Sequence, residues 1–331
     1  MNIGIVTPSP PQSRSGNRVT AIRWAKILRK LGHRVVVTQS YTDEAFDMLV
    51  ALHARRSSSS IKRFRRAHAD SALIVALTGT DLYRDLVRSK DAQGSLDVAT
   101  RIVVLQPQAL VDLRPDWQKK TRVIRQSVSQ FNRPRTRLPD KGFDVCVVGH
   151  LRHVKDPFRA AKAARFLPKS SRIRVIHLGG ALTEAEAARA RLEMMSNARY
   201  RWLGEVSPSR VAAVMSKSRL FVISSRMEGG ANALGEAIVA GLPVLASRIP
   251  GSVGILGDDY PGYFRVGDTR ELARFMLRCE TEPQFLADLT SRCRRLAALF
   301  DPSREKAAWV DLLDELFAAP HHYVTELSQR L

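Results

Sequence analysis

The chain has little cysteine and no long apolar run. Its three cysteines, Cys146, Cys279 and Cys293, cannot all pair with one another, and none of them forms a CxxC motif. We therefore expect free thiols and a reducing cytoplasm as the compartment. No apolar run approaches the ~18 residues of a membrane-spanning helix, and the first residues lack the basic start and apolar core of a signal peptide. These absences predict a protein without stable membrane insertion.

Histidine pairs with metal-ligand spacing are missing, and aromatic residues are few. The scattered histidines predict no metal site, so we expect neither a metal nor another cofactor. Aromatic residues make up 7% of the chain, and the basic run at 55–66 contains one of them, Phe64. Nucleic-acid grooves add several aromatic stacking platforms to positive charge. The run therefore favours a solvated face over an anion-guiding surface, and both over a nucleic-acid site.

What the chain has in excess is positive charge. Its formal net charge is +21 over 331 residues. Such charge attracts nucleic acid, a membrane surface or phosphorylated small molecules, and does not choose among them. The length suits two domains of roughly 150 residues each. A hydrophobic fraction of 44% and a charged fraction of 26% are typical of a globular protein.

Short apolar runs alternate with helical patterns along the chain. Strands are predicted at 3–6, 35–38, 73–77, 102–105, 123–124, 144–148, 175–178, 220–223 and 244–246. Helices are predicted at 17–31, 156–166 and 183–195, the last with Thr183 as N-cap and Glu186 completing a capping box. This alternation predicts an α/β fold of parallel sheets with helices on both faces.

The pattern breaks once, at 133–142, where two prolines, a glycine and alternating charge are typical of a linker. We therefore predict two Rossmann-like domains, 1–138 and 139–301, that face a central cleft with the carboxyl ends of their strands. An amphipathic helix is predicted at 302–318. Its apolar face packs on the second domain or crosses back to the first.

The most informative segment follows the strand at 220–223. A loop there holds Glu228, Gly229 and Gly230, then Ala231, and a helix begins with Asn232 as the predicted N-cap. Glycines at such a turn adopt backbone angles closed to other residues and let an anion approach the helix N-terminus.

A second carboxylate, Glu236, lies about one turn inside that helix. Its two oxygens match the adjacent hydroxyls of a ribose, and Glu228 is placed to reach a sugar. A carboxylate within an otherwise apolar helix is costly without a partner. Carboxylates beside an anion site predict a nucleotide-sugar site, with surface carboxylates as the alternative.

The second half opens with a basic loop after the strand at 144–148. Gly149 ends the strand, His150, Arg152 and Lys155 follow, and Asp156 is the predicted N-cap of the next helix. A leaving diphosphate needs positive charge where its own charge develops, and fixed cations supply it. Arg152 and Lys155 are therefore the candidate catalytic cations, with a solvated basic loop as the alternative.

These residues resemble a known family. The pattern Glu-x7-Glu with glycines between, followed by Ala-x-x-x-Gly-Leu-Pro-Val, resembles the retaining GT-B glycosyltransferases of the GT4 type. The resemblance implies that Glu236 binds the donor ribose and that Glu228 contacts the donor sugar. It also implies a retaining reaction without a metal.

The same resemblance places the family's diphosphate-holding Arg/Lys pair in the loop at 149–155. Lys155 matches the pair. His150 stands where the arginine is expected, so Arg152 substitutes for it or His150 donates instead.

The first half supplies the candidate acceptor residues. Gly16, Asn17 and Arg18 follow a long loop and offer a helix N-terminus to an anion, although the family's glycine pair is reduced to Gly16. Thr80 and Asp81 follow the strand at 73–77 and are expected to face the acceptor. Asp81 is a base, a hydroxyl anchor or an N-cap.

Three segments look closer still to the selenosugar synthases of selenoneine biosynthesis. They are Pro-Ser-Pro-Pro-x-Ser-x-Ser-Gly-Asn-Arg, Thr-Gly-Thr-Asp and Val-Val-Gly-His-Leu-Arg-x-Val-Lys-Asp-Pro. This resemblance implies a UDP-sugar donor, UDP-glucose or UDP-GlcNAc, and selenophosphate as the selenium donor. The expected reaction forms a C–Se bond and releases UDP. The alternatives are a GT4-type transferase with a hydroxyl acceptor and a basic nucleic-acid-binding protein.

Overall fold

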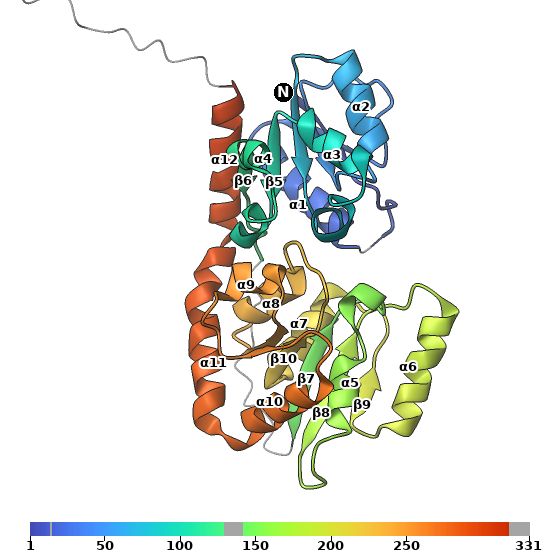
Figure 1. Ribbon diagram of the computed structural model, residues 1–331, viewed down its shortest axis with the longest axis vertical. Coiled ribbons are helices and arrows are strands. Elements are labelled where there is room, and N and C mark those ends of the chain that lie inside the picture. Colours follow the sequence, from blue (N-terminus) through green and yellow to red (C-terminus); the bar gives the residue numbers. More distant parts are fainter. Residues whose placement is uncertain (14, 129–141, 318–331) are drawn as a thin grey trace, which may run out of the picture.

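The computed structural model describes residues 1–13, 15–128 and 142–317. The linker predicted at 133–142 lies outside these ranges except for Gly142. The described chain forms two halves, each built on one parallel sheet with helices packed against it, and the halves stack along the long axis (Figure 1). This arrangement confirms the predicted α/β class.

The first sheet has six strands in the order β2-β1-β3-β4-β5-β6, and each neighbouring pair is parallel. Its strands are β1 (Asn2–Val6), β2 (Arg34–Thr38), β3 (Met48–Leu52), β4 (Ala72–Ala76), β5 (Arg101–Val104) and β6 (Thr121–Val123). The helices between them are α1 (Gly16–Lys30), α2 (Ser58–Ala67), η1 (Asp81–Asp85), α3 (Lys90–Asp97), η2 (Pro107–Leu110) and α4 (Pro115–Lys119). β3 and β4 are buried at every position, as expected for a parallel sheet covered on both faces.

The second sheet also has six parallel strands, in the order β12-β11-β10-β7-β8-β9. Its strands are β7 (Phe143–Val148), β8 (Ile173–Leu178), β9 (Tyr200–Trp202), β10 (Leu220–Ile223), β11 (Val244–Ser247) and β12 (Tyr263–Phe264). The helices are η3 (His153–Lys155), α5 (Arg159–Ala164), α6 (Glu184–Ser196), α7 (Pro208–Lys217), α8 (Asn232–Val239), α9 (Pro250–Leu256), α10 (Thr269–Thr281), α11 (Pro283–Leu296), η4 (Ala297–Phe300) and α12 (Pro302–Phe317).

All nine strands predicted from the sequence overlap strands of the structure, and α6 carries the predicted capping box between Thr183 and Glu186. Three strands were not predicted: β3, β9 and β12. β9 and β12 have three and two residues, too few to show a period. β3 is a five-residue apolar run that the sequence shows, so its omission is an error of the sequence analysis.

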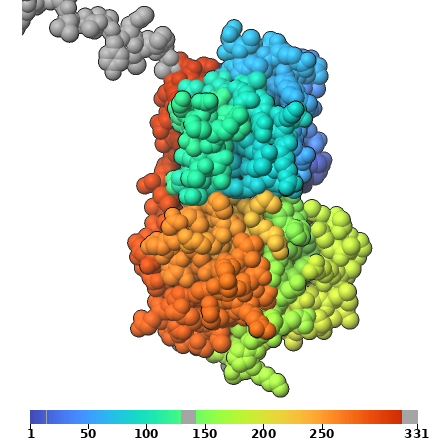
Figure 2. Space-filling model, viewed as in Figure 1, coloured from blue at the N-terminus to red at the C-terminus, as the bar shows by residue number. Residues whose placement is uncertain are grey.

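The strand order reverses once in each sheet, and these two places position the site. β1 lies between β2 and β3, and β7 lies between β10 and β8. At such a reversal the loops that follow the two central strands separate and open a crevice at the carboxyl edge. The two carboxyl edges face each other, because Gly79 after β4 packs against Gly229 after β10. Figure 2 shows the two halves meeting along one seam.

α12 leaves the second half and packs on the first (Figure 1). Trp309 is fully buried and meets Trp24 of α1 edge to face, with ring centroids 5.1 Å apart. Glu305 is buried as well: its Oε1 accepts from Nε1 of Trp24 at 2.8 Å, and its Oε2 accepts from the N–H of Ser127 at 2.8 Å. The helix therefore completes the core of the first half.

Candidate active site

Glu228 stands in the loop after β10, beside the reversal point of the second sheet. It is buried, with 7% of the residue exposed. Lys155 Nζ donates to its Oε1 at 2.6 Å, and the hydroxyl of Ser225 donates to the same oxygen at 2.5 Å. A buried carboxylate needs such partners because it has left water. An ion pair thus joins the loops after β7 and β10, and Oε2 of Glu228 has no hydrogen-bond partner among the described residues.

The loop after β7 carries His150 and Arg152. The N–H of Gly180 donates to Nδ1 of His150 at 3.1 Å. A neutral imidazole in this position carries its proton on Nε2. Arg152 is partly buried, and within the described ranges its guanidinium makes no hydrogen bond or ion pair. The loop therefore offers one cation that no described protein group holds.

Gly149, where this loop begins, is tied to the neighbouring strand. Its N–H donates to the carbonyl of Leu178 at 2.8 Å, and its carbonyl oxygen lies 3.0 Å from Nε2 of His177. Burial lowers the pKa of His177 to about 4, so its ring is neutral at pH 7. Because the N–H of Gly149 belongs to the sheet, it cannot donate to a ligand. Gly149 therefore shapes the loop, and its predicted contact with the donor stays a prediction that does not involve its N–H.

Asp156 does not cap the helix that follows, as the sequence analysis predicted. It adopts a left-handed backbone with φ of 45°, and α5 begins after Phe158. Its carboxylate instead pairs with Arg159 at 2.8 Å and lies 3.8 Å from Arg226 of the β10 loop. This acid thus ties the two loops together behind the Lys155–Glu228 pair.

Glu236 lies in α8, in the second turn from its start. Burial raises the pKa of this carboxyl, and the charge of Arg23, from α1 of the other half, partly opposes that rise. No hydrogen bond joins the Glu236 carboxylate to any residue in the described part of the chain. A carboxylate that is this desolvated, and that keeps both oxygens free, is suited to a ligand with two adjacent hydroxyl groups.

The N-terminus of α8 differs from the prediction. Ala231, not Asn232, is the N-cap, and it has the left-handed backbone φ of 40° that is uncommon outside glycine. Asn232 is the first helical residue, and its Oδ1 accepts from both terminal nitrogens of Arg23 at 3.3 Å. This side chain joins the two halves, so the predicted N-cap role is wrong.

Gly229 and Gly230 are required for space rather than for backbone angle. Neither has a positive φ in the structure, contrary to the reason given by the sequence analysis. A Cβ on Gly229 would overlap the carbonyl group of Thr78, and one on Gly230 would lie 2.8 Å from the Leu105 side chain. The glycines therefore let the β10 loop approach the first half.

The predicted acceptor residues of α1 lie at the same seam. Ser15 caps the helix by accepting from the N–H of Arg18 at 3.5 Å, and a Cβ on Gly16 would stand 4.0 Å from Nδ2 of Asn232. Asn17 is exposed. Nε of Arg18 is buried and has no hydrogen-bond partner in the described chain. The start of α1 thus lies close to α8 at Gly16, and Arg18 carries one guanidinium nitrogen without a described partner.

Thr80 and Asp81 follow β4, but only Thr80 can face a ligand. Asp81 is fully buried, and its carboxylate accepts from the N–H groups of Thr78 at 2.9 Å, Gly79 at 2.8 Å and Ala54 at 3.1 Å. Both carboxylate oxygens are therefore occupied by backbone N–H groups and shielded from solvent. The roles predicted for Asp81, as an anchor for the acceptor substrate, as a base or as an N-cap, are all wrong. Thr80 itself is partly exposed.

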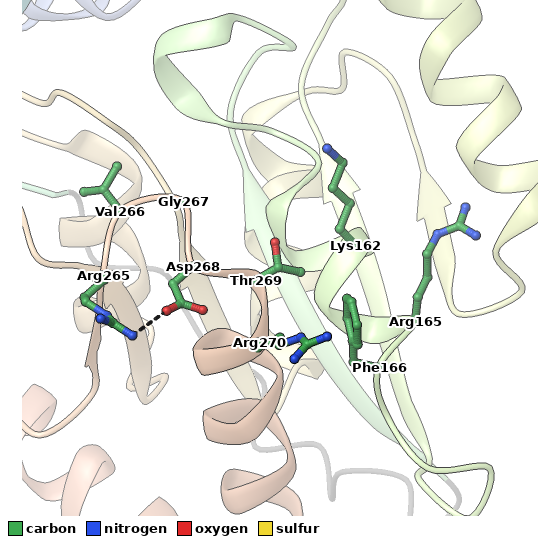
Figure 3. Close-up of a pocket in the computed structure, with 9 residues that line it drawn as sticks. All are labelled: Lys162, Arg165, Phe166, Arg265, Val266, Gly267, Asp268, Thr269 and Arg270. Atoms are coloured by element: carbon green, nitrogen blue, oxygen red, sulfur yellow. Dashed lines mark hydrogen bonds and ion pairs between the residues drawn. The ribbon is translucent and has the colours of Figure 1, made fainter.

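Two hollows open on the second half. The smaller, of about 420 Å³, lies at the carboxyl ends of β8 and β9 beside His150, and is lined by Gly180, Ala181, Leu182, Thr183, Glu184, Ala187, Trp202, Gly204 and Glu205. The larger, of about 760 Å³, lies between the end of α5 and the start of α10 (Figure 3). None of its lining residues belongs to the loops after β7 and β10, so it is separate from the Lys155–Glu228 pair.

Comparison with known proteins agrees with this geometry. The sequence matches the family model described as "Glycosyl transferases group 1" over residues 128–295. No curated protein matches the sequence. The match spans half of the chain and includes the loops that hold Lys155, Glu228 and Glu236.

The chain belongs to the glycosyl transferases group 1.

Solved structures show the same fold. Sucrose-phosphate synthase from Thermosynechococcus elongatus superposes with a TM-score of 0.78 at 17% identity, covering 96% of this chain and 99% of the other. HepE (Alr3699) from Anabaena, in complex with UDP and glucose, superposes with a TM-score of 0.74 at 17% identity, covering 95% and 100%. The predicted GT-B fold is thereby confirmed.

Sequence reasoning missed several residues of this glycosyltransferase's cleft. Ser225, Arg23 and Gln126 are ordinary residues in no motif. Gln126 donates to Thr20, and its Oε1 would lie 2.7 Å from a Cβ on Gly230. Arg23 was not selected because its partners, Asn232 and Glu236, are more than 200 residues away. Only the fold brings them together.

The described part of the chain holds no metal-ligand cluster and no membrane-spanning helix, and its cysteines are free thiols. Within it, no group of three or more His, Cys, Asp or Glu side chains is arranged to hold a metal ion. None of its helices combines the length and the apolarity needed to cross a bilayer. All three cysteines are buried free thiols, as predicted.

Proposed function

We propose that this glycosyltransferase transfers a sugar from a UDP-linked donor, UDP-glucose or UDP-GlcNAc, to selenophosphate. The bond between the anomeric carbon and the diphosphate oxygen breaks, and UDP leaves with its electron pair. A selenium lone pair forms the new C–Se bond on the face from which UDP departs, so the anomeric configuration is retained. The observation that carries the donor site is the Lys155–Glu228 pair at the reversal point of the second sheet.

The donor site consists of the loops after β7 and β10, the hollow at the carboxyl ends of β8 and β9, and α8. Glu236 accepts hydrogen bonds from the ribose hydroxyls, since its oxygens are free and partly desolvated. The 420 Å³ hollow beside His150 accommodates the base, with Trp202 and Leu182 as apolar walls. HepE structures with UDP and with UDP-glucose support a UDP-sugar as the donor.

The diphosphate is held by positive charge and by hydrogen-bond donors. Lys155, Arg152 and the Nε2–H of His150 all belong to the loop after β7, and the N-terminus of α8 adds its dipole. Such preorganised positive charge stabilises the leaving UDP without a metal. Glu228 keeps Lys155 oriented while the site is empty, and its free Oε2 accepts a hydroxyl of the donor sugar.

The acceptor enters from the first half. Arg18, whose Nε lacks a described partner, and the partly exposed Thr80 supply hydrogen-bond donors to a small oxyanion. A second candidate, transfer to a hydroxyl acceptor, is favoured by the group 1 family as a whole. Membership of a glycosyltransferase family disfavours the nucleic-acid alternative.

One assay separates the two acceptors. Purified protein is incubated with UDP-glucose or UDP-GlcNAc, with and without selenophosphate, and UDP release and the sugar product are measured by mass spectrometry. Selenophosphate-dependent UDP release with a selenium-bearing sugar supports the proposal. UDP release that requires a sugar or lipid hydroxyl and ignores selenophosphate contradicts it.

The affinity for UDP-glucose should fall in mildly acidic solution. Burial raises the pKa of Glu236 in the free protein, whereas hydrogen bonds from ribose stabilise the ionised carboxylate and lower its pKa in the complex. A ligand that lowers a pKa binds more weakly as pH drops through the pKa of the free protein. Calorimetric titrations across pH should show this loss, and Glu236→Gln should flatten it. An unchanged pH profile in that variant would exclude Glu236 as the titrating group.

A further inference from the structure

His53 stands at the reversal point of the first sheet, one residue after β3. It is 2% exposed, and its backbone φ is 74°. A left-handed backbone is unfavourable for a residue other than glycine and persists only where surrounding contacts impose it. In the sequence His53 is one of the scattered histidines that predict no metal site.

The hydrogen bonds of the ring fix its tautomer. The N–H of Arg56 donates to Nδ1 at 3.3 Å, so Nδ1 is unprotonated. The ring proton is therefore on Nε2, which lies 3.2 Å from the hydroxyl oxygen of Thr80. Burial lowers the pKa of His53, although Asp81 and Asp85 partly oppose this, so the ring is neutral at pH 7. Nε2–H consequently donates to Thr80.

This bond determines what Thr80 can offer. Its oxygen already accepts from His53, so its own hydrogen is directed elsewhere. Thr80 is partly exposed, and it follows Gly79, whose Cβ would stand 2.9 Å from the N–H nitrogen of Gly229. Thr80 therefore lies next to the contact between the β4 loop and the loop of Glu228, the residue that accepts a hydroxyl of the donor sugar under the proposed function.

The surroundings make the pair rigid. Asp81 bonds the backbone on both sides of it, at Ala54 beside His53 and at Thr78 and Gly79 beside Thr80. β3 and β4 pair in register up to Leu52 and Ala76, so both loops leave the same edge. The hydroxyl is thus held by a fixed framework and needs little reorganisation when an anion arrives.

We infer that His53 is a positioning residue, which holds the Thr80 hydroxyl so that it donates its hydrogen to an oxygen of the acceptor anion. This inference rests on the proposed function and adds the residue pair that recognises the oxyanion. Asp81, predicted from the sequence to bind the acceptor, instead supports this pair from behind.

Equilibrium binding tests the inference without requiring turnover. Selenophosphate is titrated calorimetrically into UDP-loaded protein. Thr80→Val should weaken selenophosphate about 10-fold or more, because a hydrogen bond to a charged group is lost, while Thr80→Ser should bind within a few-fold of the original chain. The affinity for UDP should stay the same in both variants.

His53 is tested through Thr80. His53→Leu should weaken selenophosphate several-fold in the original chain and have no further effect in the Thr80→Val background. His53→Gln, which places an amide N–H near Nε2, should restore most of the affinity. A purely structural role would instead give losses that add to those of Thr80→Val and that extend to UDP.

The outcomes separate this inference from the proposed function. If UDP-loaded protein binds selenophosphate with the expected variant pattern but forms no selenium-bearing sugar, the pair recognises the anion and the proposed reaction is wrong. If no selenophosphate binds, or if Thr80→Val binds as well as the original chain, the inference is overturned.

Discussion

Lys155→Met should lower kcat for UDP release by about 10²–10³-fold, equivalent to roughly 2.7–4 kcal/mol of transition-state stabilisation. The ammonium is the only cation of the β7 loop that the structure places within hydrogen-bond distance of Glu228, at 2.6 Å. Charge develops on the diphosphate as the sugar leaves, so the effect should fall on kcat more than on the KM for the donor. Steady-state UDP release measures both constants. Lys162→Met, at an exposed lysine of the larger hollow, is the matched control and should leave both constants unchanged.

This substitution also removes the ion-pair partner of a buried carboxylate, and the two effects must be separated. In the Lys155→Met variant the buried Glu228 carboxylate keeps only the Ser225 hydroxyl as a partner. The melting temperature of this variant should therefore fall. Adding Glu228→Gln removes the unpaired charge and should recover thermal stability without recovering kcat. Recovery of kcat in the double variant would show that Lys155 acts only by holding Glu228.

Trp309→Ala should lower the free energy of unfolding by about 3–5 kcal/mol, the usual range for a fully buried aromatic side chain. Trp309 is fully buried and contacts Trp24 edge to face, in the core of the first half. Its Nε1 has no hydrogen-bond partner in the described chain. Trp309→Phe, which keeps an aromatic ring and removes that N–H, should therefore cost much less. Urea unfolding of the original chain, Trp309→Ala and Trp309→Phe measures the three free energies of unfolding.

The control for this prediction lies on the same helix. Phe317 ends α12 and is 43% exposed, so Phe317→Ala should cost less than about 1 kcal/mol. Equal losses for Trp309→Ala and Phe317→Ala would contradict the conclusion that α12 is part of the first half's core.

The sequence predicted the parts of the site that depend on strand ends. Lys155 and Glu228 each follow an apolar run, and parallel strands put both loops at one edge, so their meeting was foreseeable. The motif also marked Gly229, where the structure requires glycine because of the approach of Thr78 rather than a special backbone angle; its predicted contact with the donor stays a prediction. Patterns along the chain show where a residue lies better than they show why it is there.

What the sequence did not reveal depends on contacts between distant segments. Asp81 has the chemistry of a ligand, and only its burial and its three backbone partners show that it is structural. His53 reaches Thr80 because β3 pairs with β4, and β3 was not predicted. The left-handed backbone of Ala231 is equally invisible in a sequence, because alanine rarely adopts it.

The central claim is a UDP-sugar site built around α8, and a calorimetric titration of UDP into two variants tests it most directly. The original chain and Glu282→Ala, at an exposed glutamate of α10's end, should bind UDP alike. Glu236→Ala should bind it about 100-fold more weakly, because two hydrogen bonds from ribose to a charged group are lost. Equal affinities of all three proteins for UDP, or no binding of UDP to the original chain, would contradict the account.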